Sequence, residues 1–290
     1  MISRYGIAEW YGLDFANLSP ERIREIASDP PKICPFRYPS GKCNKRGGVC
    51  SLRKYSEIGA TVTPVDQSIV TTCPNRFIER GSVFSQVAKL LIGTDSPTVV
   101  TEIPFLMGNT EGTDSKTVGM LDMVLVREDP GPMNWCAMEI QAVYFSGKSM
   151  SKEISSLKTW QGPGTPFPSE TRRPDYRSSG PKRLMPQLQI KVPTISRWGK
   201  KTAVVVDRSF WDSLTDMPRV EHVSNCDIAW FIMDFRHGPN GFRIEVGEVF
   251  LTTLTDAVSG LTGGKPASLE GFETSLAQKK KRSGFFVEPG

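Results

Sequence analysis

Apolar and polar positions along the chain follow helical and strand periods that together predict a mixed α/β fold. Apolar residues at helical spacing follow Ser19 and Pro20, which favour a helix start, and residues 83–91 form a second helical pattern that Gly93 ends. Further helices are expected at 151–160, 182–191 and 251–261, and strands at 98–105, 120–126, 135–144, 202–206, 227–234 and 242–249. These elements predict a mixed sheet flanked by helices.

The strands at 120–126 and 135–144 form a predicted hairpin that is unusual in carrying acids. The turn signal between them is centred between residues 130 and 131. If the strands pair antiparallel about that centre, Glu139 lies opposite Asp122. Because side chains alternate between the faces of a strand, both acids and Gln141 project from one face.

Two carboxylates brought together in an otherwise apolar hairpin repel each other and lose hydration. A hard divalent cation such as Mg²⁺ offsets this, and Mg²⁺ is commonly held by one or two carboxylates plus phosphate oxygens of a substrate. An Asp followed by Glu-x-Gln on the next strand is therefore typical of a phosphodiester-cleaving site. The alternative is a hairpin whose acids lie on a solvated face, and the hairpin alone does not decide between the two.

The length and charge of the chain set limits on its class. Its 290 residues suffice for one large domain, or for one domain with a smaller module. The net charge of +5 permits a polyanionic partner without requiring one. No apolar run reaches membrane-spanning length and no leader pattern opens the chain, so a cytoplasmic protein without a membrane partner is expected.

Histidine is scarce, and that scarcity excludes several chemistries. The chain has two histidines, His222 and His237, both in polar surroundings where we expect surface positions. Zinc proteases of the His-Glu-x-x-His type, histidine-metal nucleases and Ser-His-Asp hydrolases all need histidines beside specific catalytic or metal-binding residues. Neither histidine of this chain has such neighbours in the sequence, so these classes are excluded.

Four of the six cysteines fall in one segment of the first quarter of the chain. They are Cys34, Cys43, Cys50 and Cys73. In a chain without a secretion signal such a group favours a structural metal site over disulfides, with free thiols as the alternative. The prolines and glycines between the cysteines have little helix or strand preference, so a metal would help this segment to order.

Several motifs of the first half of the chain occur in the order found in a known family. They are Ile7-Ala8-Glu9-Trp10-Tyr11-Gly12, Cys34-Pro35-Phe36, Arg46-Gly47-Gly48-Val49-Cys50, Cys73-Pro74-Asn75-Arg76, Asp122 and Glu139-Ile140-Gln141. In these motifs the chain resembles the NotI-like type II restriction endonucleases of the PD-(D/E)XK superfamily.

The resemblance implies a Mg²⁺-dependent homodimer that binds double-stranded DNA and cuts both strands at a short GC-rich palindrome. It implies that Asp122, Glu139 and Gln141 form the catalytic and Mg²⁺ site, with Glu102 as a supporting acid. It also implies a structural iron on the four cysteines, whereas zinc is the commoner occupant of thiolate sites. We expect residues 1–80 to form the cysteine module and residues 81–290 the α/β nuclease core. The wider superfamily has lysine at the position of Gln141.

Candidate DNA contacts lie in the second half of the chain. The predicted helix at 182–191 presents Lys182, Arg183 and Gln187, and such side chains bind base edges and phosphates. The arginine-bearing loop at 161–181 fits either a DNA-embracing arm or an ordinary surface loop. The basic run at 279–282 suits a solvated segment or non-specific DNA contact.

Two other functions remain open from the sequence. Residues 142–149 match a loose phosphate-binding loop and residues 204–207 could serve as its acidic strand, which would indicate a nucleoside triphosphatase. Val143, Tyr144 and Phe145 favour a strand over such a loop. The other alternative is a metal-stabilised DNA-binding protein with an inactive nuclease core.

Overall fold

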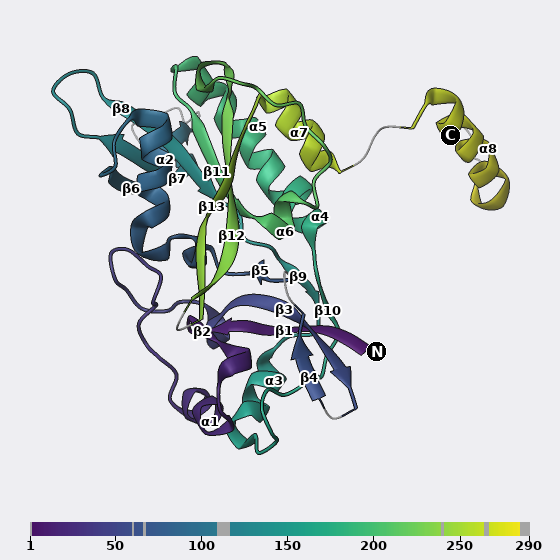
Figure 1. Ribbon diagram of the computed structural model, residues 1–290. Helices are drawn as coiled ribbons and strands as arrows, with labels where there is room; N and C mark the ends of the chain where they lie inside the picture. Colours follow the sequence, from purple (N-terminus) through teal and green to yellow (C-terminus); the bar gives the residue numbers. More distant parts are fainter. Residues whose placement is uncertain are drawn as a thin grey trace.

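The computed structural model describes residues 2–59, 61–65, 68–108, 117–238, 241–263 and 267–284. Its larger sheet has six strands in the order β13-β12-β11-β8-β7-β6, with β8, β11 and β12 parallel and the remaining pairs antiparallel (Figure 1). The strands are β6 (Thr98–Met107), β7 (Thr117–Arg127), β8 (Asn134–Ile140), β11 (Thr202–Asp207), β12 (Ile228–Gly238) and β13 (Gly241–Thr252). The predicted mixed sheet is therefore confirmed, although β8 ends at Ile140 rather than at residue 144.

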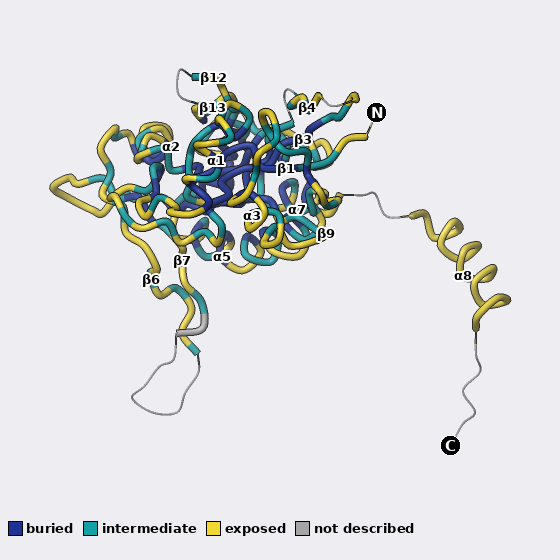
Figure 2. Tube along the Cα trace, turned by 90° about the horizontal axis from the view of Figure 1, so that it is seen from below, coloured by how far each residue is buried: buried dark blue, intermediate teal, exposed yellow. Residues whose placement is uncertain are grey.

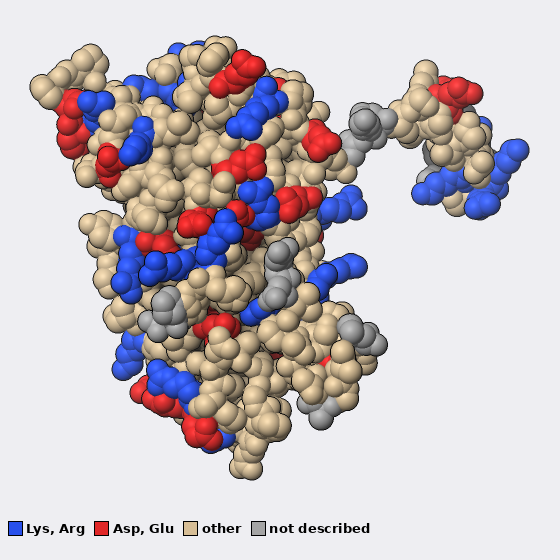
Figure 3. Space-filling view, in the orientation of Figure 1, with Lys and Arg blue, Asp and Glu red and all other residues tan. Residues whose placement is uncertain are grey.

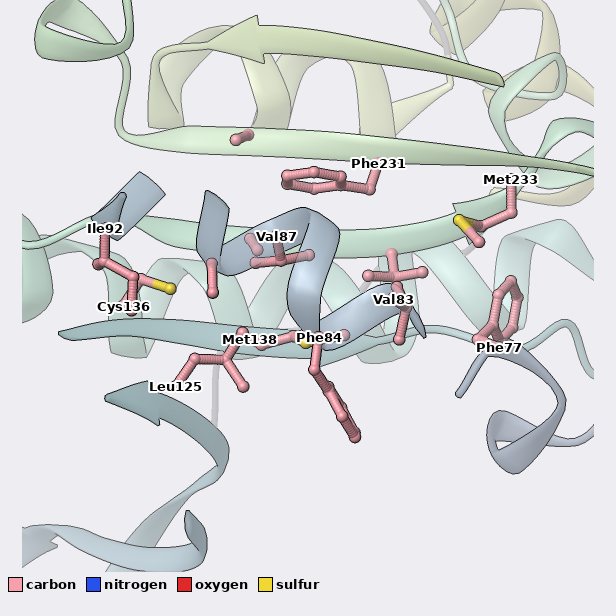
Figure 4. Packing of buried hydrophobic residues seen from close by; sticks show 14 of the residues in the cluster. Phe77, Val83, Phe84, Val87, Ile92, Leu125, Cys136, Met138, Phe231 and Met233 are labelled. Atoms are coloured by element: carbon pink, nitrogen blue, oxygen red, sulfur yellow. The ribbon is translucent and has the colours of Figure 1, made fainter. Parts of the chain in front are cut away.

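Helices cover both faces of this sheet. On one face α2 (Ser82–Ile92) packs Val83 and Val87 against strand residues that include Met138 and Phe231 (Figure 4). On the other face lie α5 (Met185–Arg197) and α7 (Leu254–Thr262), whose apolar residues pack on Val204 and Val206. Because β11 is buried on both faces, its sequence is a continuous apolar run rather than an alternating one.

A second sheet is built from the N-terminal part of the chain. Its strands are β1 (Ile2–Trp10), β2 (Leu13–Asp14), β3 (Val49–Ile58), β4 (Thr61–Pro64) and β5 (Val70–Thr71), in the order β2-β1-β3-β4 with β5 paired to β3. Helix α1 (Pro20–Ser28) packs against it, and the Ser19 hydroxyl accepts a hydrogen bond from the backbone N–H of Arg22, which confirms Ser19 as the cap. The sequence pattern did not predict this sheet. The division at residues 80 and 81 stays a prediction.

Buried polar groups connect the two sheets. The Arg76 guanidinium binds Glu9 of β1 and the Phe242 carbonyl of β13. The Asp207 carboxylate at the end of β11 accepts hydrogen bonds from the backbone N–H groups of Thr71 in β5 and of Phe210. These contacts hold the N-terminal sheet against the larger sheet near Asp207, at the C-terminal end of β11.

The remaining elements are short or lie apart from the core. They are α3 (Ser151–Ser156), α4 (Tyr176–Ser179), a π-helical turn (Gly180–Leu184), α6 (Arg208–Trp211), α8 (Leu269–Ser283), β9 (Phe145–Gly147), β10 (Arg172–Pro174) and 3₁₀ turns at Phe15–Asn17, Arg46–Gly48, Pro74–Phe77, Glu79–Gly81, Leu157–Thr159 and Val223–Asn225. Helix α8, which contains the basic run at 279–282, is exposed along its whole length and stands away from the body (Figure 2).

Two expectations about the surface can be compared with these elements. The loop at 161–181 is not an extended arm throughout, because β10 pairs with β9 and Arg172 is buried in an ion pair with Glu153. His222 and His237 are both exposed, as predicted.

Within the described ranges, no helix combines the length and the apolar character needed to cross a membrane.

Candidate active site

The β7–β8 hairpin has the register that the turn centre predicts. Met123 pairs with Met138, and the pairing continues to Arg127 opposite Asn134. One further step along the same register sets Asp122 opposite Glu139. The Lys191 ammonium contacts both side chains, and the charge of Asp122 acts on the pKa of Glu139. The hairpin therefore brings the two predicted acids together.

The two acids differ in exposure. The Glu139 side chain is only 4 % exposed, whereas the Asp122 side chain is 56 % exposed. Burial, and to a smaller extent the charge of Asp122, raise the pKa of Glu139 to about 7, against the lowering effect of the nearby Lys191 ammonium. The ionised form of Glu139 therefore depends on a cation beside it.

Lys191 of α5 supplies positive charge at this position. Its ammonium nitrogen lies 2.5 Å from Glu139 Oε1 and 3.4 Å from Asp122 Oδ1. The sequence analysis did not single out Lys191, which is far from both acids along the chain. Its spacing could have identified it, because residue 191 falls at helical spacing between Leu188 and Ile195, on the buried face of α5, where a charged residue is unexpected.

The other two predicted catalytic residues lie differently. Gln141 is buried, and its amide nitrogen donates a hydrogen bond of 2.5 Å to the carbonyl of Ala142. Glu102 is on β6 between residues that pair with Met123 and Leu121, so its backbone lies beside that of Asp122. Its side chain is exposed and its φ is +55°. Gln141 lines the same cleft as Asp122 and Glu139, whereas Glu102 does not.

A cleft of about 470 Å³ opens over the acid pair. Basic side chains from distant parts of the chain line it together with Asp122 and Glu139: Lys45, Arg46, Lys148, Arg172 and Arg183. Arg172 is neutralised by Glu153, and the other four leave the cleft with a surplus of positive charge. On the face seen in Figure 3, basic and acidic side chains lie next to each other.

The predicted DNA contacts divide between this cleft and the outer surface. Arg183 and Gln187 line the cleft, and the Arg183 guanidinium stacks 3.6 Å from the centre of the Tyr144 ring. Such stacking immobilises a long side chain that would otherwise be mobile. Lys182 is exposed and does not line the cleft.

The four clustered cysteines lie near one another as free thiols. Cys34 and Cys50 are buried together with Cys43 packed against them, and the backbone N–H of Cys73 donates to the Cys50 carbonyl at 3.2 Å. However, among the residues that the structure describes, no group of three or more His, Cys, Asp or Glu side chains is arranged to hold a metal ion. The arrangement of the thiols thus does not support the predicted metal-stabilised module.

The segment that resembles a phosphate-binding loop has other structure. Phe145–Gly147 forms the strand β9, as its residue types favour, and the next helix starts only at Ser151. Asp207, the candidate acid of the second motif, is buried and accepts two backbone hydrogen bonds. These contacts give Asp207 a structural role.

The structure combines a mixed α/β fold with a pair of acids in a basic cleft. Comparison with known families identifies the class of protein. The family model of restriction endonuclease NotI matches residues 22–246. The chain therefore belongs to the NotI restriction endonuclease family. Membership implies a site-specific deoxyribonuclease that acts on double-stranded DNA. A search of curated proteins gave no match.

Proposed function

We propose that the protein is a type II restriction endonuclease that makes Mg²⁺-dependent double-strand cuts, with Asp122 and Glu139 as its central catalytic acids. The observation that carries this proposal is the convergence of the two carboxylates at the base of a basic cleft. A structural role alone gives no reason for an exposed acid beside a buried one on the same face of an apolar hairpin.

The donor set of the cleft fits Mg²⁺. Asp122 and Glu139 offer the hard oxygen ligands that Mg²⁺ prefers, and the ion usually completes its shell with water and phosphate oxygens. When bound, Mg²⁺ would neutralise charge on the scissile phosphate and make a water molecule more acidic. Asp122 faces the cleft and would reach the ion from the solvent side, while Glu139 would hold it from the buried side.

The other side chains of the cleft bind and orient DNA in this proposal. Arg46, Lys148 and Arg183 would bind phosphates, and Gln187 would contact the DNA from the helix that carries Lys191. Gln141 has its amide nitrogen engaged with Ala142, which leaves its oxygen as an acceptor for a water proton. We propose Glu102, on the neighbouring strand, as a supporting acid. We propose Lys182, outside the cleft, as an outer DNA contact.

The chemical step is hydrolysis of a phosphodiester. The oxygen of a water molecule attacks phosphorus in line, the bond from phosphorus to the 3′ oxygen breaks, and the departing oxygen takes up a proton. The products are a 3′-hydroxyl and a 5′-phosphate. Cutting both strands of a palindrome calls for two equivalent sites, so we propose a homodimer with two-fold symmetry. The GC-rich target and the PD-(D/E)XK fold are proposed from the family resemblance, and the hairpin register supports the fold.

We also propose that the four cysteines hold a structural metal, iron by the family resemblance or zinc by thiolate chemistry. Support comes from the gathering of the thiols, because Cys34 and Cys50 are buried together with Cys43 packed against them, and all four clustered cysteines are free. Elemental analysis of the full-length protein tests this. We expect about one metal per chain in wild type and much less in Cys73→Ser, with Cys136→Ser, in β8, as the matched control. Equal metal content in the two variants would contradict the site.

The nuclease proposal is tested by digestion of DNA of known sequence. We expect wild-type protein to give discrete fragments with Mg²⁺ and none with EDTA, and Asp122→Asn to give none with either. Asp129→Asn is the matched control, because Asp129 is an exposed acid of the same hairpin whose ion-pair partner is Arg127. DNA binding by wild-type protein without cutting would instead support the inactive DNA-binding alternative.

A further inference from the structure

Helix α5 carries a lysine where its packing favours an apolar side chain. Leu188, Val192 and Ile195 are buried against the larger sheet, and Lys191 lies in the same buried stripe with only 10 % of its side chain exposed. An ammonium group in such a position is costly unless it is paired. Packing alone therefore does not account for a lysine at this position, and its charged partners must explain it.

Those partners are the two acids of the candidate active site. The Lys191 ammonium lies 2.5 Å from Glu139 Oε1 and 3.4 Å from Asp122 Oδ1, and the described structure gives it no further hydrogen bond or ion pair. Gln141, the next residue of the hairpin on that face, carries no charge and donates its amide N–H to Ala142. The positive charge that touches the acid pair therefore comes from the helix.

We propose that the Lys191 ammonium is a tethered counter-ion of the Asp122–Glu139 pair, which holds the two carboxylates together until a divalent cation displaces it. The inference rests on the proposed function, because it assigns the pair to such a cation. Mg²⁺ binds carboxylate oxygens at about 2.0–2.1 Å. The Lys191 nitrogen lies 2.5 Å from Glu139 Oε1, so the ammonium and a divalent cation would compete for the same carboxylate. Lys191 is thus a positioning residue that acts through the acids.

The counter-ion predicts an effect on metal affinity that a packing role does not. Full-length protein without DNA is titrated with Mn²⁺ at pH 8, and the free ion is measured by electron paramagnetic resonance. Lys191→Met and Lys191→Gln should both bind Mn²⁺ at least about tenfold more tightly than wild type. A neighbouring charge commonly shifts an ionic equilibrium by about one pKa unit or more, and one unit corresponds to a tenfold change in affinity. Arg197→Met, which removes an exposed charge from the last turn of the same helix, should leave Mn²⁺ affinity unchanged.

The outcomes separate this inference from the proposed function. Unchanged or weaker Mn²⁺ binding in both Lys191 variants, with wild-type thermal unfolding in at least one, overturns the counter-ion. Loss of DNA cleavage in Asp122→Asn supports the proposed function whichever result the Lys191 variants give. In cleavage assays the half-saturating Mg²⁺ concentration should fall in Lys191→Met, whereas a residue that only packs would leave it unchanged.

Discussion

Replacement of Arg76 by methionine should destabilise the protein strongly, because Arg76 is the charged centre of the contact between the two sheets. The residue is fully buried. Its Nε lies 2.8 Å from both carboxylate oxygens of Glu9, Nη1 binds Glu79, and Nη2 donates to the Phe242 carbonyl at 3.1 Å. Its guanidinium also lies 4.2 Å from the centre of the Phe36 ring.

The magnitude follows from what the substitution leaves behind. Methionine fills much of the space, but among the described side chains it leaves the buried Glu9 carboxylate with the Ser51 hydroxyl alone as a partner. Breaking a buried pair in this way costs about 3–5 kcal/mol. At about 2–3 °C per kcal/mol for a chain of this size, Tm should fall by roughly 6–15 °C. Arg22→Met is the control, since the exposed Arg22–Glu25 pair is worth about 0.3–0.5 kcal/mol.

The destabilisation should depend on pH in a defined direction. Burial raises the pKa of Glu9 in the folded protein, and Arg76 opposes that rise. Without Arg76 the folded-state pKa rises further above the unfolded value of about 4.3. A raised carboxyl pKa costs stability above the folded-state pKa and costs nothing below the unfolded one. The difference in Tm between wild type and Arg76→Met should therefore shrink from pH 8 to pH 5.

Thermal unfolding followed by circular dichroism at pH 8 and pH 5 measures both effects. A double variant, Glu9→Gln with Arg76→Met, should be more stable at pH 8 than Arg76→Met alone, because an amide is buried at lower cost than an unpaired carboxylate. The reasoning is refuted if Arg76→Met shifts Tm no more than Arg22→Met does, or if its shift is the same at both pH values.

Two further predictions concern the cysteine segment. Gly48→Ala should lower Tm more than Gly59→Ala, because both glycines have positive φ (+66° and +63°) but only at position 48 would the added Cβ lie 2.1 Å from the Tyr11 ring; equal shifts would contradict the steric argument. In an Asp122→Asn background that prevents cutting, Arg46→Ala should weaken binding to all DNA sequences and reduce the slope of log affinity against log salt by about one, whereas Arg22→Ala should not. An unchanged slope, measured by fluorescence anisotropy, would remove Arg46 from the DNA surface.

The sequence predicted best those features that neighbouring residues determine. The register of the β7–β8 hairpin depends on the centre of one turn, so Asp122 could be set opposite Glu139 from residue counting. In the same way Ser19 caps α1, and Gly93 ends α2 with a left-handed conformation. These are local choices, and local residue types suffice to make them.

Features that join distant segments were not predicted. Strand β1 carries Arg4 and Glu9 among its apolar residues, so it lacks a clear strand pattern. Its partner β3 follows only after α1 and the first two clustered cysteines, Cys34 and Cys43. Glu9 can be buried because Arg76 reaches it from elsewhere in the chain. In the same way, Lys191 can be buried in α5 because it meets the acid pair of the β7–β8 hairpin, a contact between segments that are distant in the sequence. Cysteine spacing predicted the gathering of the thiols but could not give their side-chain directions.

The most direct test of the central claim is a comparison of single-turnover DNA cleavage at saturating Mg²⁺ by Asp122→Asn, Glu139→Gln and the double variant. If the two carboxylates hold one cation, either single substitution removes the site, and the double variant should be no slower than the slower single variant. Losses that multiply in the double variant, or near wild-type cleavage by either single variant, would contradict an active site built on this pair.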